Sequence, residues 1–330
     1  MATIQDVATQ AGVSVATVSR VINESPRVSP DARARVLEAI GRLDYRPNLL
    51  GRNLRRTEAR VVLVVLPSIS NPFYARIVEG IEDVARVEGF NVLLCNTGDE
   101  AERERVYLGM LSQRLADGAI LMAPSLRVDE LELLCHAHPL VQCCEFHAGA
   151  TVSHVSVDDR AAARDAVRYL LSLGHRRIAL VASHGSLVSD HCRFDGYRDA
   201  LAEADVPFDP ELVAYGRYDF ATGRACGDAF FALPPPRRPT AVFAISDLAA
   251  LGVVQAARAA GLRVPEDVGV VGFDDIAFAS MVDPPLTTIA QPQYDLGRTA
   301  AEILFRQLRD PAAPPEDRFL PHRLVIRRST

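Results

Sequence analysis

The sequence predicts an α/β protein in which a small all-α head precedes two doubly wound subdomains, each built on a parallel sheet. One observation behind this is a set of short, well-capped helical segments before residue 46. Another is the alternation of apolar strands and helices from Arg60 onward. The third is charge: residues 1–60 hold 10 arginines and 6 acids, although the whole 330-residue chain has a net charge of -6. A basic head therefore precedes an acidic body.

Three helices are expected in the head. Thr3 and Asp6 have the spacing of a capping box, which predicts a helix from Ile4 to about Gln10, followed by a turn at Gly12. Ser14 is a favourable N-cap for a second helix, from Val15 to about Asn23. Ser29 caps the third, with Pro30 at its first position. The apolar positions expected to form the core are Ile4, Val7, Ala8, Ala11, Val18, Val21, Ile22, Val36, Leu37, Ile40 and Leu43.

Two short helices joined by a glycine turn in a basic segment indicate a helix-turn-helix. Its second helix would enter the major groove, where Arg20 has the donors for bidentate contact with guanine. A small helical oligomerisation domain, with Arg20 in solvent, remains the alternative. The candidate DNA-contacting residues of the head are Thr3, Ser14, Val15, Ala16, Thr17, Ser19, Arg20 and Asn23.

The segment 45–56 holds four arginines and several leucines but is too polar and glycine-broken for a stable isolated helix. A helix that orders only on DNA would explain this composition, because leucine can wedge between base steps in the minor groove. Asn48, Leu54 and Arg55 are its candidate DNA contacts. A plain interdomain linker is the alternative.

The body contains two sets of apolar segments that are typical of buried parallel strands. Helices are expected to start near Pro72 and Glu100 in the first set. In the second set they are expected near Asp159, Asp190, Thr222 and Asp247. The predicted strands are 61–66, 91–95, 119–122 and 140–144, then 178–181, 213–215, 241–245 and 268–273.

Ligands of such folds bind beyond the carboxyl ends of the strands, in the crevice between the two sets. The loops at those ends offer aromatic rings, carboxylates and one arginine, which suit a small polar ring compound. Alternatives stay open: Phe73 and Phe220 could be core residues, Asp247 a helix N-cap, and Asp274 a turn cap. The candidate ligand contacts are Ser70, Phe73, Tyr74, Glu145, Phe146, Arg193, Phe220, Ser246, Asp247 and Asp274.

Several motifs occur in a distinctive order along the chain. In the head they are Thr3-Ile4-Gln5-Asp6-Val7-Ala8, Ala11-Gly12-Val13-Ser14, Thr17-Val18-Ser19-Arg20-Val21 and Tyr45-Arg46-Pro47-Asn48. In the body they include Asn71-Pro72-Phe73, Gly272-Phe273-Asp274-Asp275 and Pro285-Leu286-Thr287-Thr288-Ile289. On these motifs the chain resembles the LacI/GalR family of bacterial repressors over nearly its whole length.

The resemblance implies a helix-turn-helix head over 1–46, a hinge helix and linker over 47–59, and an effector-binding and dimerisation domain over 60–330. That domain would have a periplasmic-binding-protein-like fold. Its N-subdomain would take about 60–157 and 290–319, and its C-subdomain about 158–289 and 320–328. The implied assembly is a homodimer on a pseudo-palindromic operator, with contacts near the helix at Phe73 and near 275–282.

The resemblance also assigns roles to single residues. Arg193 and Asp274 would contact the effector, Phe220 would stack on it, and Leu54 would be the minor-groove wedge. Gly51 and Ser246 depart from the residues that many members have. The dipeptide Glu145-Phe146 and the tripeptide His191-Cys192-Arg193 resemble nucleoside-responsive members, which favours a nucleoside effector over a pentose or hexose.

Other classes of function find little support in the sequence. There is no Walker A, Gly-x-Gly-x-x-Gly or Gly-x-Ser-x-Gly motif, so we expect neither an enzyme nor a cofactor. The cysteines and histidines at 135–147 lack zinc-site spacing, so no metal is expected. A periplasmic binding protein would share the body but needs a signal peptide. None is visible, and neither is a membrane span, so we expect a cytoplasmic protein with reduced thiols.

Overall fold

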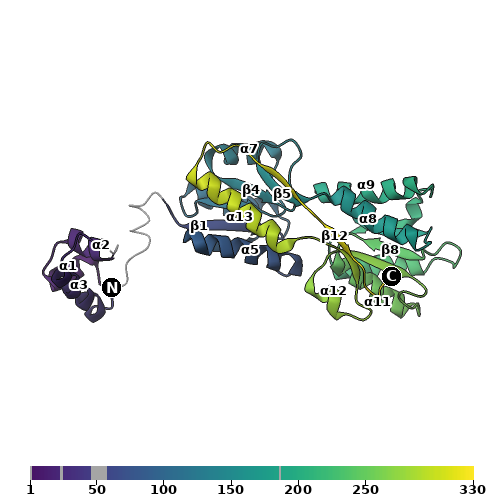
Figure 1. The fold of residues 1–330 in the computed structure, drawn as a ribbon, viewed down its shortest axis with the longest axis horizontal. Coiled ribbons are helices and arrows are strands. Elements are labelled where there is room, and N and C mark those ends of the chain that lie inside the picture. The colour runs from purple at the N-terminus through teal and green to yellow at the C-terminus, as the bar shows by residue number, and fades with distance from the viewer. Residues whose placement is uncertain (1, 23–24, 46–57, 186) are drawn as a thin grey trace. The chain divides into compact units, whose positions relative to one another are not determined.

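A computed structural model describes residues 2–22, 25–45, 58–185 and 187–330. The chain divides into two compact units, Met1–Ala59 and Arg60–Thr330, each with its own hydrophobic core (Figure 1). The smaller unit is all-helical, and the larger contains two mainly parallel sheets covered by helices. The predicted α/β fold class is therefore confirmed. Within the described residues, no helix combines the length and the apolar character that crossing a bilayer requires.

The head is built from α1 (Ile4–Ala11), α2 (Val15–Ile22) and α3 (Pro30–Arg42). The Thr3 hydroxyl accepts the Asp6 N–H at 3.2 Å, and the Asp6 carboxylate accepts the Thr3 N–H at 2.8 Å. The hydroxyls of Ser14 and Ser29 accept the N–H groups of Thr17 and Ala32. The predicted caps of all three helices are therefore confirmed.

The predicted core of the head is wrong at one position. Val7, Val18 and Val36 are completely buried, but Leu37 is 55% exposed. Successive residues of an α-helix point about 100° apart, so a helix that buries Val36 turns Leu37 toward its flank. Ala39 lies about one turn after Val36 on the same side of α3 and is buried, whereas Leu37 is not.

The N-subdomain is a six-stranded parallel sheet in the order β11-β5-β4-β3-β1-β2. The helices α5 (Pro72–Glu88) and α13 (Gln293–Arg309) pack on one face (Figure 1), and α6 (Ala101–Ser112) and α7 (Val128–Ala137) on the other. The strands are β1 (Val61–Leu66), β2 (Asn91–Asn96), β3 (Gly118–Leu121), β4 (Leu140–Cys143), β5 (Ser153–Val157) and β11 (Asp317–Leu320).

The C-subdomain repeats this plan, with the order β12-β10-β9-β8-β6-β7 and one antiparallel pair, β10 with β12. Two helices, α8 and α9, pack on one face, and α10, α11 and α12 pack on the other. The helices are α8 (Asp159–Ser172), α9 (Val188–Glu203), α10 (Phe220–Phe231), α11 (Asp247–Ala259) and α12 (Ala277–Met281). The strands are β6 (Ile178–Ser183), β7 (Val213–Gly216), β8 (Ala241–Ala244), β9 (Gly269–Asp274), β10 (Thr287–Ala290) and β12 (Arg323–Val325).

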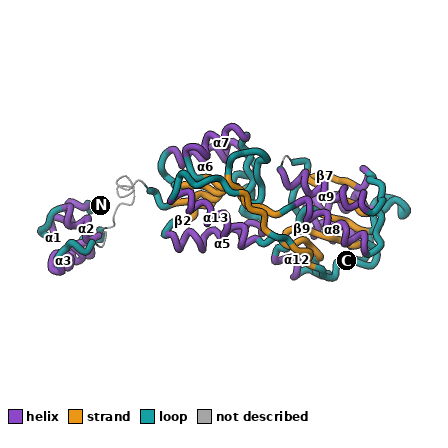
Figure 2. Tube along the Cα trace, turned by 45° about the horizontal axis from the view of Figure 1, so that its top comes forward, coloured by secondary structure: helices purple, strands orange, loops and turns teal. Residues whose placement is uncertain are grey.

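The chain passes from one sheet to the other three times, after β5, after β10 and after β11. Figure 2 shows these connections running between the two sheets. Residues at the crossings therefore touch both subdomains, and any rotation of one subdomain against the other must change backbone angles there.

Every predicted strand is present, with ends that differ by at most two residues, but β5, β10, β11 and β12 were not predicted. Two of these carry polar side chains at buried positions. Ser153, His154 and Ser156 of β5 and Thr287 and Thr288 of β10 are all buried. The Thr288 hydroxyl, for example, donates to the distant Asp247 carboxylate. An apolar run was the signal used to find strands, and these strands lack one.

Close helix packing in both subdomains depends on glycine. A Cβ at Gly297 of α13 would lie 1.9 Å from the carbonyl oxygen of Ile77 in α5, and one at Gly80 would lie 2.2 Å from that of Tyr294. In the C-subdomain, a Cβ at Gly223 of α10 would lie 1.8 Å from the Ala249 carbonyl oxygen in α11. Backbone atoms of a packed helix cannot turn aside, so each pair of helices must separate if a methyl group is added.

We therefore expect Gly297→Ala to lower the free energy of unfolding by about 3 kcal/mol, the upper range for overpacking. Gly109→Ala in α6 is the matched control, because a Cβ there meets only the Gln113 side chain at 3.9 Å. Alanine has the higher helix propensity, so the control should be neutral or more stable by up to about 1 kcal/mol. Urea unfolding measures both, and equal stability of the two variants would contradict this packing.

Candidate functional site

Buried polar side chains gather where the carboxyl ends of strands from the two sheets meet. They come from the loop after β4, the starts of α8 and α9, the loop after β7 and the ends of β9 and β10. All are buried except Tyr218, which is half-buried. We call this set the junction cluster: Glu145, Asp159, Ser189, Asp190, Arg193, Tyr218, Asp274 and Gln291. Its place is where open α/β folds bind ligands.

Arg193 is held from three sides. Its Nε donates to Asp159 at 2.8 Å, and one Nη donates to the Ile245 carbonyl oxygen at 2.6 Å. The guanidinium carbon lies 3.8 Å from the centre of the Phe273 ring, which gives a cation–π contact. Arg193 is thereby held by α8, by the residue after β8 and by β9. Its guanidinium donors therefore have one orientation before any ligand binds.

Glu145 connects the two subdomains. Its carboxyl accepts the backbone N–H of Ser189 at 3.2 Å and also the Ser189 hydroxyl. That hydroxyl lies 3.1 Å from the Tyr218 hydroxyl, which donates to Asp190. Glu145 follows β4 of the N-subdomain, whereas the other three residues belong to the C-subdomain. Opening of the two subdomains would break the Glu145–Ser189 contact.

Asp274 is hydrogen-bonded to the connection that follows β10, the second of the three that join the two sheets. Its carboxyl accepts the Gln291 side-chain N–H at 2.8 Å, and its carbonyl oxygen accepts that of Gln293 at 2.7 Å. Its φ of 119° is a conformation that side chains other than glycine rarely adopt. Such strain persists only where surrounding contacts hold it, and it concentrates at functional sites.

Burial favours the uncharged form of two carboxyl groups in the junction cluster. Burial raises the pKa of Glu145 to about 8, and Arg193 and Ser189 only partly offset this. Burial also raises the pKa of Asp274 to about 7, against the opposing effect of Arg193. Arg193 and Asp159 form an ion pair and cancel. The cluster is therefore rich in hydrogen-bonding groups but has no excess positive charge, which suits an uncharged polar ligand.

These raised pKa values predict that stability falls as the pH rises. A carboxyl whose pKa is higher in the folded state favours folding below its unfolded pKa, and this contribution is lost as the pH rises through the folded value. We expect the melting temperature to decline between about pH 5 and pH 8, and Glu145→Gln to flatten part of that decline. Glu102→Gln, at an exposed position of α6, is the control. An identical pH profile for Glu145→Gln and the wild type would contradict the burial of this carboxyl.

Two neighbouring aromatic candidates, Tyr74 and Phe73, differ in their surroundings. Burial raises the pKa of Tyr74 well above its ordinary value, and the nearby Cys144, Glu145 and Asp274 raise it further, which places its hydroxyl beside the cluster. Phe73 is buried in the N-subdomain core, with its ring edge-on to Tyr74 at 5.3 Å. Phe73 is therefore a core residue, which was the alternative interpretation of this position.

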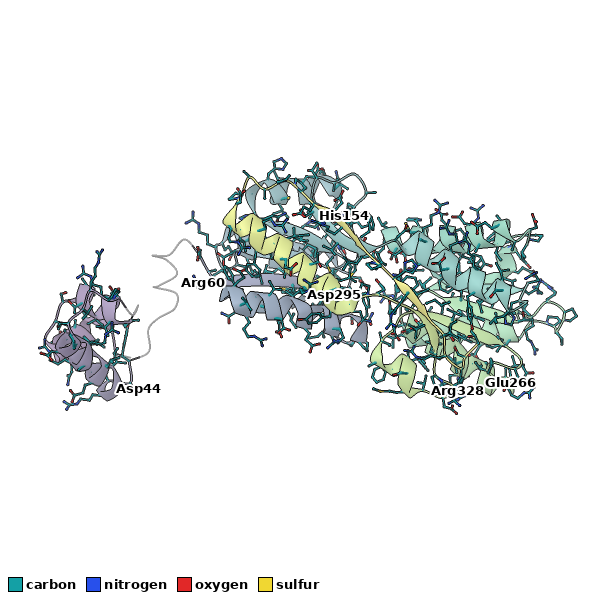
Figure 3. All side chains as sticks on the ribbon, viewed as in Figure 1. Asp44, Arg60, His154, Glu266, Asp295 and Arg328 are labelled. Carbon is teal, nitrogen blue, oxygen red and sulfur yellow. The ribbon has the colours of Figure 1, made fainter. Side chains whose placement is uncertain are left out.

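Phe146 turns away from Glu145, its neighbour in the chain. Its ring stacks on His154 of β5 at 4.0 Å and meets Phe319 of β11 edge-on. Figure 3 shows His154 in the N-subdomain sheet. Phe146 therefore packs at one edge of that sheet instead of joining the other candidates.

The remaining candidates occupy varied places. Ser246 caps α11 by accepting the Ala249 N–H, so the expectation that Asp247 is the cap is wrong. Asp247 is completely buried and accepts the Ile276 N–H at 2.8 Å and the Thr288 hydroxyl at 2.5 Å. Phe220 begins α10 and is 41% exposed. Ser70 is exposed, with its hydroxyl 2.8 Å from that of Ser68.

Sequence reasoning brought together Glu145, Arg193, Asp274 and Tyr74 but missed the residues that hold them. Asp159 follows a strand that was not predicted, and Gln291 follows another. Ser189 lies in the first turn of α9, and Tyr218 lies in the loop after β7, two residues before the chosen Phe220. A buried tyrosine needs a partner for its hydroxyl, and that signal could have favoured Tyr218.

In the head, a cavity of about 320 Å³ opens beside the N-termini of α2 and α3. The Ser14 and Thr17 hydroxyls lie 2.9 Å apart there, and Arg20 is exposed. The cavity is lined by Val13, Ser14, Thr17, Arg20, Arg27, Val28, Ser29 and Ala32. Helix N-termini and arginines favour an anion such as a DNA phosphate. Sequence reasoning did not select Arg27.

The other head candidates differ in accessibility. Ala16 and Thr3 are exposed, whereas Val15 is half-buried against the head core, and Ser19 is half-buried too. The Thr3 hydroxyl donates to Asp6 at 2.8 Å. The candidates Asn23, Asn48, Leu54 and Arg55 lie outside the described residues.

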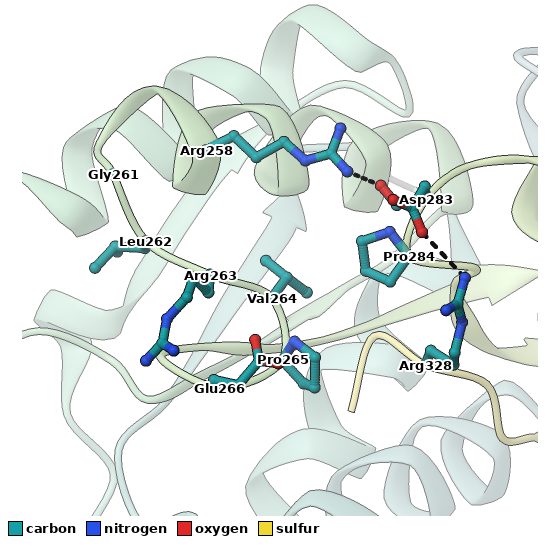
Figure 4. A pocket seen from close by; sticks show the side chains of 10 residues that line it. All are labelled: Arg258, Gly261, Leu262, Arg263, Val264, Pro265, Glu266, Asp283, Pro284 and Arg328. Atoms are coloured by element: carbon teal, nitrogen blue, oxygen red, sulfur yellow. Dashed lines mark hydrogen bonds and ion pairs between the residues drawn. The ribbon is translucent and has the colours of Figure 1, made fainter.

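A second cavity, of about 580 Å³, lies on the C-subdomain and not at the junction cluster (Figure 4). Arg258 and Arg328 both reach Asp283 at its rim, so their charges are already paired with acidic or carbonyl oxygens. As for metals, the described part of the chain contains no group of three or more histidine, cysteine, aspartate or glutamate residues that could hold an ion. All six cysteines are free thiols.

Two family models match the chain. One is described as bacterial regulatory proteins, lacI family, and matches residues 3–48. The other is a periplasmic binding protein-like domain and matches residues 167–330. The first covers the three helices of the head, and the second covers most of the C-subdomain and α13.

Relatives match over the full length. The HTH-type transcriptional repressor CytR of Escherichia coli is 38% identical, over 100% of this chain and 96% of its own. Catabolite control protein A of Priestia megaterium is 36% identical, over 99% of both. The structure is similar to the lac repressor dimer bound to operator and the anti-inducer ONPF, with a TM-score of 0.88, 29% identity and coverage of 99% and 98%. It is also similar to the CelR–cellobiose complex, with a TM-score of 0.75, 34% identity and full coverage of both chains.

Proposed function

Because this chain belongs to the lacI family of bacterial regulatory proteins, we propose that its head reads an operator and that its junction cluster receives a nucleoside. Family membership makes the chain a DNA-binding transcriptional repressor controlled by a small-molecule effector, and not an enzyme. The family resemblance inferred from the sequence motifs is thereby confirmed.

For DNA, we assign the surface at the N-terminus of α2 to the operator. Arg20 supplies the base contact, and Ser14, Thr17, Ser19 and Thr3 supply phosphate contacts with Asn23. Arg27 joins them, because it lines the same cavity as Ser14 and Arg20. Val15 and Ala16 contribute shape or contact a thymine methyl group.

Two copies of the chain are proposed to act together. A homodimer places its two heads on the half-sites of a pseudo-palindromic operator, with the helices of segment 47–59 between them. Within that segment, Leu54 wedges into the minor groove while Asn48 and Arg55 contact the backbone. We place the dimer in the cytoplasm, with access to the chromosome.

For the effector, the observation that carries the proposal is the charge balance of the junction cluster. Arg193 is paired with Asp159, and Glu145 and Asp274 have raised pKa values. An uncharged compound with hydroxyl groups and a flat ring uses these donors and acceptors and the Tyr74 and Tyr218 rings. A nucleoside fits this description better than a pentose or hexose, because a sugar has no aromatic base.

Six further candidates are proposed with supporting roles. Phe220 is exposed and stacks on the base, while Ser70 lies on the loop after β1. Phe73, Phe146, Ser246 and Asp247 act through packing or capping, since their side chains are turned into the fold. Closure of the two subdomains on the effector shifts the balance between two states by its differential affinity for them.

A thermal-shift screen tests the effector class, because a ligand that binds only the folded state raises the melting temperature. We expect a nucleoside to stabilise the protein by about 2.7 kcal/mol when its concentration is 100 times Kd. The matching 5′-monophosphates should give a smaller shift, because the cluster has no unpaired cation for a phosphate. A pentose or hexose that stabilises the protein while every nucleoside fails would overturn the nucleoside assignment.

A further inference from the structure

Two adjacent cysteines stand beside the junction cluster and take no part in the proposed function. Cys143 is the last residue of β4, and Cys144 follows it immediately before Glu145. Their sulfur atoms are 3.8 Å apart, close enough for a thiol hydrogen bond. Adjacent side chains of an extended strand point to opposite faces, so this proximity requires a local departure from strand geometry.

The backbone of Cys144 provides that departure. Its φ is 73°, in the left-handed region, while its N–H still donates to the Val155 carbonyl oxygen at 2.8 Å. A left-handed residue other than glycine is strained and persists only where its surroundings hold it. The turn brings the second sulfur back toward the first, so the two thiols form a pair.

The two thiols differ in access. Cys143 is completely buried, whereas Cys144 is 9% exposed, with Tyr74 and Glu145 nearby. Cys144 therefore offers the more accessible of the two sulfur atoms to a small oxidant, and the Cys143 sulfur lies within reach behind it. The hydrogen bond with Cys143 raises the pKa of Cys144 well above its ordinary value, and burial and the nearby Glu145 and Asp159 raise it further, so its thiolate is scarce at neutral pH.

We propose that Cys143 and Cys144 are an oxidisable pair of thiols that a peroxide converts to a disulfide between adjacent residues. The Cys144 sulfur attacks one peroxide oxygen, the O–O bond breaks, and a sulfenic acid and one water form. The Cys143 sulfur then displaces the sulfenic hydroxyl, which leaves as a second water as the S–S bond forms. The two thiols lose two protons and two electrons, and the peroxide is reduced to two waters.

The product would be readily reduced and would disturb Glu145. Neighbouring Cα atoms are 3.8 Å apart across a trans peptide, below the usual 4.4–6.8 Å for a disulfide. The ring therefore forces the backbone at Cys144 to change, and strained disulfides are the labile ones. Since Glu145 is the next residue, its contact with Ser189 should be lost on oxidation. This last step rests on the proposed function of the junction cluster.

Peptide mass spectrometry tests the pair directly. Trypsin releases residues 128–160 as one peptide that contains Cys135, Cys143 and Cys144. In the full-length Cys135→Ser variant, peroxide should make this peptide lighter by two hydrogens, dithiothreitol should restore it, and the reaction should be faster at alkaline pH. Cys144→Ser in the same background should show no such loss. A peptide that only gains oxygen, or stays unchanged, would overturn the proposal.

Effector affinity tests the connection to Glu145. We expect oxidised protein to bind the nucleoside about tenfold more weakly than reduced protein, the effect of losing one to two hydrogen bonds. Loss of two hydrogens with unchanged affinity would overturn the connection. Failure of reduced protein to bind any nucleoside would instead count against the proposed function, while the mass change would still decide whether the thiol pair exists.

Discussion

Replacing Arg193 with alanine is expected to weaken effector binding about 100-fold and to leave the operator affinity of the effector-free protein unchanged. Arg193 is buried, with its guanidinium held by Asp159, the Ile245 carbonyl oxygen and the Phe273 ring. A donor that is already oriented loses little entropy when a ligand binds, so its removal is costly. A 100-fold loss corresponds to about 2.7 kcal/mol, within the range for hydrogen bonds that involve a charged group.

The same substitution leaves Asp159 buried without its partner, which destabilises proteins by roughly 3–5 kcal/mol. A double variant, Arg193→Met with Asp159→Asn, removes both charges and separates binding from folding. It should unfold at nearly the wild-type urea concentration and still fail to respond to effector. Arg198→Ala, at an exposed position on the same helix, should behave as wild type. A double variant that folds and retains full effector affinity would show that the ligand lies elsewhere.

Replacing Arg20 with alanine is expected to weaken operator binding by 10- to 100-fold and to relax the preference for one base pair. The side chain is exposed on α2 beside the Ser14 and Thr17 hydroxyls. A bidentate arginine–guanine contact discriminates by about 1–3 kcal/mol, whereas a phosphate contact adds affinity for any sequence. Arg20→Ala should therefore reduce specific binding more than non-specific binding.

Arg42→Ala is the matched control, because it removes the same charge from the same unit. Arg42 lies at the end of α3 and pairs with Glu38 on an exposed surface. Its loss should lower both specific and non-specific affinity slightly, through the general electrostatic attraction. Fluorescence anisotropy with labelled duplexes measures both variants. Equal loss of specific affinity in the two would mean that Arg20 acts only through its general charge and is not a base reader.

The sequence predicted the fold class and the caps of the head because those depend on local chemistry. Ser14 and Ser29 accept N–H groups within their own helices, and both were found correctly. Strands β5 and β10 were missed, since polar residues occupy buried positions in both, and some of these, such as Thr288, have partners distant in the chain. α13 was missed although Leu296, Ala300 and Leu304 give it an apolar stripe at helical spacing.

In the candidate site, too, some residues were predictable from nearby sequence and others depended on partners distant in the chain. Arg193 and Asp274 were found because they follow predicted strands or loops, but their partners Asp159 and Gln291 follow strands that were not predicted. The orientation of Phe146 was beyond sequence reasoning, because it depends on the His154 ring and on β11, which joins the sheet from the end of the chain. Side-chain direction in a loop is decided by tertiary contacts, which spacing does not reveal.

The proposed function requires that a nucleoside at the junction cluster control how tightly the head holds DNA. The direct test is operator affinity over a range of salt concentrations, with and without saturating nucleoside, on a duplex selected from a random library by the purified full-length protein. We predict a steep fall in affinity with salt, because phosphate contacts release counterions. We also predict a change of about 5- to 150-fold in affinity on adding nucleoside, the usual range of coupling between two sites. Affinity that does not depend on salt, or that is the same with and without nucleoside, would contradict the account.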